Sequence, residues 1–278
     1  MAGVSTKEIK NRIRSMESTR QITKAMEMVA ASKLRRTQAQ VQAARPYFET
    51  LRTTIDEIIS SNQDFSSVYL QQRPVQKVVY IVIAGDRGLA GGYNSNILKD
   101  ALSKIQQQEA TVLPIGRKAV EFFKLRGVPL LTENHAEAAA VTLGDCFSIA
   151  KKLCKQFGNG EFDSVSIIYT EFVSVLSQET RELSMLPLQK QEGQTKERDV
   201  LYEPDSKTVF DAIIPEYLGG VLYGALCESR ASEQAARRTA MDNATQNAEE
   251  MIENLSLQFN RARQAAITGE IIDIIAGS

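Results

Sequence analysis

The 278-residue sequence has no tryptophan, one histidine and three cysteines. The histidine, His135, lies between Glu133 and Glu137, and these residues do not form a His-Glu-x-x-His metal motif. The cysteines are too few for a disulfide framework and lack Cys-x-x-Cys spacing, so we expect reduced thiols. They are Cys146, Cys154 and Cys227. The sequence therefore predicts no catalytic residue, no cofactor and no metal site.

A surplus of one charge is also missing, because 33 basic residues stand against 34 acidic ones. This balance argues against binding to nucleic acid through the charge of the whole chain. The distribution is uneven, since residues 1–45 carry ten Lys or Arg and three Glu, a local net of +7. That excess suits an acidic partner or a solvated helix face. No run approaches the roughly 20 apolar residues of a membrane span, and the start lacks a signal peptide's apolar region.

Glycine and proline are absent from two long stretches, the 42 residues between Gly3 and Pro46 and the 44 between Gly224 and Gly269. Both stretches are rich in Ala, Met, Lys, Arg, Glu and Gln, which lose little on entering a helix. At 1.5 Å per residue, each stretch predicts one helix of about 65 Å. We expect Pro46 to kink the first helix without ending it.

Apolar residues recur along both stretches in steps of three and four, the period of a coiled coil. In the N-terminal stretch they are Ile9, Ile13, Met16, Ile22, Met26, Val29, Val41, Ala44, Phe48, Leu51, Ile55 and Ile58. The step of six between Met16 and Ile22 predicts a change of seam along the rod. In the C-terminal stretch they are Leu218, Leu222, Ala225, Ala231, Ala235, Ala236, Ala240, Ala244, Met251, Leu255, Phe259, Ala262 and Ala266. The small residues favour a close approach of the two helices.

The middle of the chain alternates short β-branched runs with helical segments. Strands are predicted at 78–84, 111–115, 129–132 and 164–172, with an edge strand at 181–189. Helices are predicted between them, near 93–108, 116–126 and 136–157. This alternation is typical of a Rossmann-like open sheet.

The two long helices both emanate from this central domain, and neither can bury its apolar stripe alone. We therefore expect them to pair antiparallel. The predicted fold is α/β: a long antiparallel coiled coil of the N- and C-terminal helices plus a central Rossmann-like α/β domain. The predicted domains are 1–72, 73–205 and 206–278, with the first and last paired.

The most enzyme-like feature is the glycine-rich turn 85–94, which follows the strand at 78–84 and opens a helix. It lacks the Gly-Lys-Ser/Thr end of a phosphate loop, and it lacks a Gly-x-Gly-x-x-Gly pattern with an acidic residue about 20 positions further on. We therefore predict a structural turn in which the glycines allow tight backbone packing.

Hydrogen-bonding side chains gather near the end of the C-terminal stretch. They are Asn260, Arg261, Arg263, Gln264, Thr268 and Glu270. A plain coil would tolerate them on a solvated face. Gln264 and Thr268 lie on overlapping helix faces beside small alanines and present mixed donors and acceptors. This arrangement suits contact with a loop of another protein.

Three segments carry a resemblance to the gamma subunit of F-type ATP synthases, and the match covers essentially the whole chain. They are QITKAMEMVAASK at 21–33, DRGLAGGYN at 86–94 and RARQAAITGEIID at 261–273. The chain departs from the family where it ends Gly277-Ser278 instead of Gly-Ala, and where Ala90 replaces a frequent cysteine. Neither departure affects the shaft.

The resemblance implies a non-catalytic central rotor shaft, present once per complex. The shaft would stand inside a ring of three alpha and three beta subunits, with a foot that binds epsilon and the membrane c-ring and is turned by proton flow. Implied contacts to alpha and beta are Met26, Arg237, Arg263, Gln264, Thr268 and Glu270. The matching residues of the globular-domain loop are Asp86, Arg87, Gly88, Gly91, Gly92 and Asn94.

The resemblance further implies a peripheral protein without a transmembrane segment, on the cytoplasmic face of a bacterial plasma membrane. It implies no nucleic acid, no cofactor and no small-molecule substrate. Two alternatives stay open at this point. One is a coiled-coil adaptor whose basic N-terminal arm binds nucleic acid, and the weaker one is a Rossmann enzyme that uses the turn 85–92.

Overall fold

The computed structural model describes residues 6–61, 66–188 and 203–276. Within these ranges the side chains of Val41, Ala44, Arg45, Ser60, Ser61, Glu270, Asp273 and Ile274 are outside the description. The chain divides into two compact units. The first, called here the terminal coil, comprises residues 1–32 and 237–278, and the second, called the body, comprises residues 33–236. Each unit is described by itself.

The body is built on a four-stranded sheet with the order β2-β1-β3-β4. The strands are β1 (Lys77–Ile83), β2 (Glu109–Ile115), β3 (Ser164–Phe172) and β4 (Gln178–Leu186). Strand β1 pairs in parallel with β2 and β3, and β4 pairs antiparallel with β3. Three predicted strands are thereby confirmed, and the predicted edge strand is β4, which starts three residues earlier than expected.

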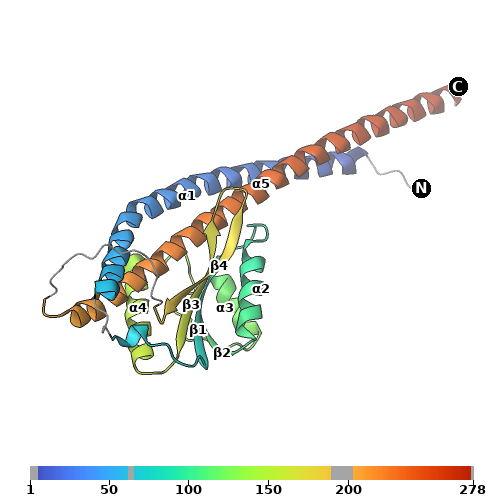
Figure 1. Cartoon of the computed structure of the whole chain (residues 1–278). Helices are drawn as coiled ribbons and strands as arrows, with labels where there is room; N and C mark the ends of the chain where they lie inside the picture. The colour runs from blue at the N-terminus through green and yellow to red at the C-terminus, as the bar shows by residue number, and fades with distance from the viewer. Residues whose placement is uncertain (1–5, 62–65, 189–202, 277–278) are drawn as a thin grey trace. The chain divides into compact units, whose positions relative to one another are not determined.

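Helices cover both faces of the sheet because the strands are apolar on both sides. Figure 1 shows α2 (Tyr93–Ile105) and α4 (Leu143–Gly158) on opposite sides of the sheet. Val78, Tyr80 and Val82 of β1 join the core of α2 and α3 (Arg117–Leu125). The alternate residues Val79, Ile81 and Ile83 join the core of α4, as the two-residue period of a strand requires.

Two predicted elements of the body are wrong in extent. The strand expected at 129–132 is a single parallel bridge between Val112 and Leu130, because Pro129 has no N–H to extend the pairing. The helix expected from 136 begins at Leu143, where Thr142 and Asp145 form a capping box.

Two long helices each contribute residues to both units, α1 (Thr6–Ser61) and α5 (Ser206–Ala276). Helix α1 includes Pro46, and α5 includes Pro215 and four glycines, so α5 extends well beyond the stretch without glycine. A Cβ at Gly219 would lie 2.3 Å from Cδ1 of Phe147 on α4, and one at Gly220 would lie 2.0 Å from Cδ1 of Phe48 on α1. These two glycines therefore let α4 and α1 approach the backbone of α5.

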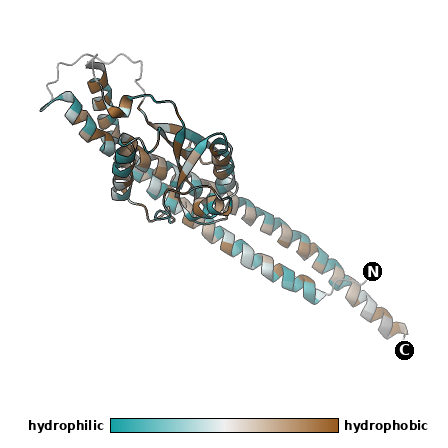
Figure 2. Cartoon of the chain, turned by 90° about the horizontal axis from the view of Figure 1, so that it is seen from below, coloured by the Kyte–Doolittle hydropathy of each residue, from teal (hydrophilic) through white to brown (hydrophobic). Residues whose placement is uncertain are grey.

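Segments 6–32 of α1 and 237–276 of α5 form the terminal coil. Arg20 pairs with Glu249, whereas Glu27, further along α1, pairs with Arg238, earlier on α5. The helices therefore run antiparallel, as predicted. Figure 2 shows hydrophilic and intermediate residues interspersed with hydrophobic ones along both helices.

The predicted shift of the α1 seam is wrong. Ile22 and Val29 are 57% and 55% exposed, whereas Thr23 and Ala30 are 8% and 0% exposed. The inward-facing positions follow unbroken steps of four and three: Ile9, Ile13, Met16, Arg20, Thr23, Glu27 and Ala30. Likewise on α5, Leu255 is buried as predicted, but Met251 is 44% exposed. The prediction from apolar residues alone was wrong because polar and small residues occupy the middle of the seam on the two helices.

One 18-residue window of α5, within residues 206–269, is apolar enough by length and composition to cross a membrane. This is weak support for a span, because 44% of the window is buried within the protein. Phe210, Ile214, Leu218 and Leu222 of this helix lie in the body's core, which accounts for its apolar composition.

Candidate functional site

The C-terminal end of α5 extends past the first described residue of α1. Thr23 faces Thr245 in the antiparallel pair. Because both helices rise by the same distance per residue, Thr6 of α1 lies opposite about residue 262 of α5. Figure 1 shows the end of α5 continuing beyond the start of α1. Exposed isoleucines lie on this extension at positions 267, 271, 272 and 275, with exposures of 49%, 51%, 58% and 69%. A surface of this kind is typical of a partner contact.

Three predicted contact residues lie on this extension, and all three are exposed: Arg263, Gln264 and Thr268. The Thr268 hydroxyl donates a hydrogen bond to the Gln264 carbonyl at 2.9 Å. The side chains of Arg263 and Gln264 make no hydrogen bond or ion pair to any other part of the chain that the structure describes. The side chain of Glu270 lies outside the described residues.

The other two predicted contact residues, Met26 and Arg237, lie on the paired part of the coil, and both are half-buried. From Arg237 to Arg263 the helix rises by about 39 Å at 1.5 Å per residue. The structure therefore brings Arg263, Gln264 and Thr268 together but leaves Met26 and Arg237 at a separate level.

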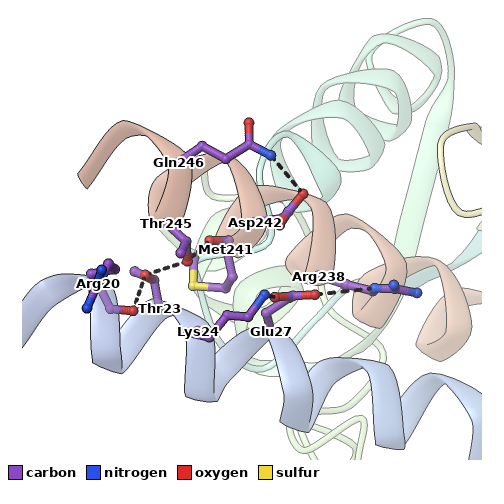
Figure 3. A network of polar contacts seen from close by, with 9 residues as sticks. All are labelled: Arg20, Thr23, Lys24, Glu27, Arg238, Met241, Asp242, Thr245 and Gln246. Atoms are coloured by element: carbon purple, nitrogen blue, oxygen red, sulfur yellow. Dashed lines mark hydrogen bonds and ion pairs between the residues drawn. The ribbon is translucent and has the colours of Figure 1, made fainter. Parts of the chain in front are cut away.

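At the level of Met26, the seam contains a network of polar contacts that we call the polar belt (Figure 3). The hydroxyls of Thr23 and Thr245 lie 2.7 Å apart and are buried. The Thr245 hydroxyl is also 2.8 Å from the Met241 carbonyl, and the Thr23 hydroxyl is 3.1 Å from the Arg20 carbonyl. Each hydroxyl has one hydrogen, so the hydroxyl that donates to the other cannot also donate to its own carbonyl, whereas the accepting hydroxyl can. Two of the three contacts are therefore hydrogen bonds at any moment, and one of these two joins the helices.

Charged residues continue the belt next to this pair. Lys24 donates to Glu27 at 2.7 Å, and Arg238 of α5 approaches the same carboxylate at 3.9 Å. The Glu27 side chain is only 14% exposed. Its hydrogen bond raises the pKa of Lys24 above the ordinary value. Because solvent screens the exposed Lys24 and Arg238 ends of these ion pairs, the belt specifies register more than it adds stability.

Sequence reasoning missed the polar belt because it searched for apolar residues. Their spacing could have identified these residues, because Arg20, Thr23 and Glu27 continue the steps of four and three that begin at Ile9. Extending those steps along the sequence, whether or not the residues reached are apolar, leads to all three.

The glycine-rich loop after β1 is closed by its own chain. The Asp86 carboxylate accepts hydrogen bonds from the N–H groups of Ala138 and Ala139 at 2.7 and 3.0 Å. Asn94 accepts from the Gly85 N–H at 2.8 Å and donates to the Arg87 carbonyl at 3.1 Å. This geometry favours the predicted structural turn.

The remaining predicted residues of this loop have backbone roles or face solvent. Gly91 has a φ of +54°, which favours glycine, and Gly92 precedes the first turn of α2 as its cap. Arg87 and Gly88 are exposed. The structure thus brings the six loop residues together as one folded turn.

His135 is half-buried and lines a cavity of about 160 Å³ with Asp145 and Lys152. Burial lowers its pKa, nearby Lys152 lowers it further, and Asp145 opposes the shift. Among the described residues, no cluster of three His, Cys, Asp or Glu could hold a metal ion. The three cysteines are buried and free.

The fold and these sites define a class of protein: an α/β body together with an antiparallel pair of helices, one of which presents an exposed end. Comparison with known proteins identifies the family. A family model described as ATP synthase matches residues 5–278. The ATP synthase gamma chain of Ruminococcus albus is 47% identical over 98% of this chain and 97% of its own length. That of Alkaliphilus metalliredigens is 43% identical over 99% and 98%.

Solved structures agree. The central stalk of the Tetrahymena thermophila mitochondrial ATP synthase superposes with a TM-score of 0.60 and 26% identity, covering 80% of this chain and 99% of that one. A rotor chain of the Euglena gracilis enzyme gives 0.64 over 94% and 98%, and at 21% identity it supports the fold alone. The chain belongs to the ATP synthase gamma chain family.

Family membership confirms the expected fold class and the expected role as the rotor shaft of an ATP synthase. It also confirms that the chain is a subunit of that complex. The basic-arm adaptor and the Rossmann enzyme therefore lose their basis.

Proposed function

We propose that this shaft is non-catalytic and that the end of α5 conveys its angle to the catalytic subunits. One observation carries the proposal: α5 is a single helix of 71 residues whose first part packs in the core of the body and whose last part is the exposed extension. A turn applied to the body therefore reaches Arg263 and Gln264 through one unbroken hydrogen-bonded helix.

In this proposal, alpha and beta surround the shaft, and the foot binds epsilon and the membrane c-ring at the cytoplasmic face of a bacterial membrane. The shaft segments are 1–72 and 206–278, and the foot is 73–205. Because one asymmetric rod cannot contact three beta subunits alike, each beta is biased toward a different conformation at any angle.

The differential contact energy that the shaft must supply to one beta subunit can be compared with the energy of a few hydrogen bonds. Moving one beta subunit from 1:99 to 99:1 between two conformations takes about 5.5 kcal/mol of differential binding. A hydrogen bond to a charged group contributes about 1.5–3 kcal/mol. The side chains of Arg263 and Gln264, which make no hydrogen bond or ion pair among the described residues, together supply a large part of the requirement when they contact beta.

The test is to replace Arg263 and Gln264 together by alanine and to measure proton-driven ATP synthesis in reconstituted vesicles. We expect synthesis to fall at least tenfold, because a loss of about 1.4 kcal/mol already changes a population ratio tenfold. The matched control replaces Asn247 and Glu250, two exposed residues on the paired part of the same helix. Unchanged synthesis in the Arg263/Gln264 variant, or an equal loss in the control, would refute this role of the extension.

A further inference from the structure

Open α/β sheets bind their ligands in the crevice at the carboxyl ends of the strands, where the strand order reverses. In this protein that point lies between β1 and β3, since β2 stands on one side of β1 and β3 on the other. The last parallel pair joins Val82 to Ile168. Strand β3 continues to Phe172, so its edge facing β1 is open from residue 169 onward.

Helix α5 occupies this open edge. The Thr170 N–H donates to the Ser229 hydroxyl at 3.1 Å, and the Ser232 hydroxyl donates to the Thr170 carbonyl at 3.1 Å. All three residues are buried, with exposures of 5% for Thr170, 1% for Ser229 and 0% for Ser232. The two serines therefore satisfy the backbone groups that a neighbouring strand would otherwise pair.

The same turn of α5 is held from a second direction. Arg230 donates through Nε to the Ala138 carbonyl at 3.1 Å and through Nη2 to the Val141 carbonyl at 2.7 Å. The opposite side of the same segment is bonded to Asp86 through the N–H groups of Ala138 and Ala139. Arg230 is thus linked to the glycine-rich loop through a single layer of backbone.

Glu233 completes the arrangement. A Cβ on Gly85 would lie only 2.9 Å from Oε1 of Glu233. The Glu233 carboxylate therefore packs against the backbone of the loop, in a space that any side chain at position 85 would fill. We call Ser229, Arg230, Ser232 and Glu233 the α5 clamp. Its contacts on β3, on residues 138–141 and at Gly85 fill the crevice that other α/β domains use for a ligand.

We propose that the α5 clamp is the joint that fixes the rotation of α5 against the body and so transmits torque between them. The proposal rests on the function proposed above. Hydrophobic burial is non-directional, so burial alone holds α5 against the sheet without fixing its angle, and the close packing at Gly219 limits that angle only at a point ten residues before the clamp. Hydrogen bonds weaken steeply as they are misaligned, and those of the clamp grip the helix from two directions within about 6 Å of its length.

The test uses complexes assembled from full-length subunits, with the alpha-beta ring fixed to a surface and a rod attached to the body. Angular fluctuations of the rod are recorded without ATP, together with the rate of ATP hydrolysis in solution. The variants are Ser229→Ala with Ser232→Ala, and separately Arg230→Lys, which keeps the charge but loses the two-carbonyl grip. Ile214→Val, a core substitution on the same helix, is the control for lost stability.

We expect the angular variance to rise roughly twofold in both clamp variants, since each leaves directional bonds on one side only. Hydrolysis should stay unchanged, and Ile214→Val should show wild-type variance even though its melting temperature is lowered. Wild-type variance in a clamp variant that assembles, or an equal rise in Ile214→Val, overturns the joint. If the double serine variant does not assemble, Arg230→Lys decides alone. A wild-type complex that never rotates with ATP refutes the proposed function instead.

Discussion

Gly219 of α5 offers a sharp test of how tightly the shaft packs in the body. Replacing a helical glycine by alanine stabilises a helix by about 1 kcal/mol. At Gly219, however, the new methyl group would lie 2.3 Å from Cδ1 of Phe147 and 3.0 Å from its Cα. Rotating the ring relieves the first contact but not the second, because Cα belongs to the backbone of α4. Helix α4 must therefore move.

Overpacking of this kind costs about 1–3 kcal/mol. Gly219→Ala should thus lower the free energy of unfolding of the body by about 0–2 kcal/mol once the gain in helix propensity is subtracted. Gly224 supplies the matched control, because it lies five residues further along the same helix and a Cβ there would meet nothing within 4 Å. Gly224→Ala should stabilise by the full propensity term, about 1 kcal/mol.

The two variants are compared in the full-length chain by urea unfolding and by hydrogen exchange of the amides of β1 and β3, which report on the body. The predicted difference between them, about 1–3 kcal/mol, is the packing cost itself. If Gly219→Ala is as stabilising as Gly224→Ala, then α4 and α5 are not in close backbone contact, and the reasoning is wrong.

Three further predictions concern other regions. Replacing Thr23 and Thr245 together by valine should raise the stability of the terminal coil, because an apolar pair of the same shape needs no hydrogen bond. Either single replacement should not, because it leaves the other buried hydroxyl without its partner across the seam. Protection of amides 6–32 from hydrogen exchange measures the effect, and a destabilised double variant would contradict it. Burial lowers the pKa of His135 below its usual 6.5, so stability should fall as the pH drops from 6.5 toward the folded-state pKa, where the unfolded chain takes up the proton first. His135→Asn should flatten that slope in urea titrations between pH 7 and 5, and an unaltered slope would refute the assignment. Burial raises the pKa of Cys146 and of Cys154 to about 12 and also raises that of Cys227, so at pH 8 a thiol reagent should label these residues only as fast as the body unfolds; rapid labelling of the native chain would show that the thiols are accessible.

The two long helices and the parallel sheet were predictable because their signals are strong and local. The stretches without glycine or proline and the β-branched run of β1 each specify one element. The ends of elements were less predictable. Helix α5 includes Gly219 and Gly220, and the sequence does not show why two glycines stand next to each other in a helix, whereas tertiary packing requires them there. The late start of α4 depends on Thr142 and Asp145, which cap the helix after an alanine-rich segment that has helical propensity of its own.

The functional regions divide in the same way. Arg263, Gln264 and Thr268 stood out as polar residues in an apolar seam, and their exposure could be anticipated. The α5 clamp could not be predicted, because the partners of Ser229 and Arg230 are backbone groups 59 and 92 positions away in the chain. Side chains that bond to a distant backbone leave no periodicity, and only the folded chain reveals them.

The pairing of the two ends of one chain also has a consequence for biosynthesis. The segment of α1 in the terminal coil ends at Ser32, and the segment of α5 that pairs with it begins at Arg237. A ribosome that adds 5–20 residues per second therefore leaves the α1 segment without its partner for about 10–40 s. A continuous apolar stripe exposed for so long would invite aggregation. We therefore expect the threonine, arginine and glutamate in the middle of this seam to keep the unpaired segment soluble, so that residues which add little stability to the finished coil protect the nascent one.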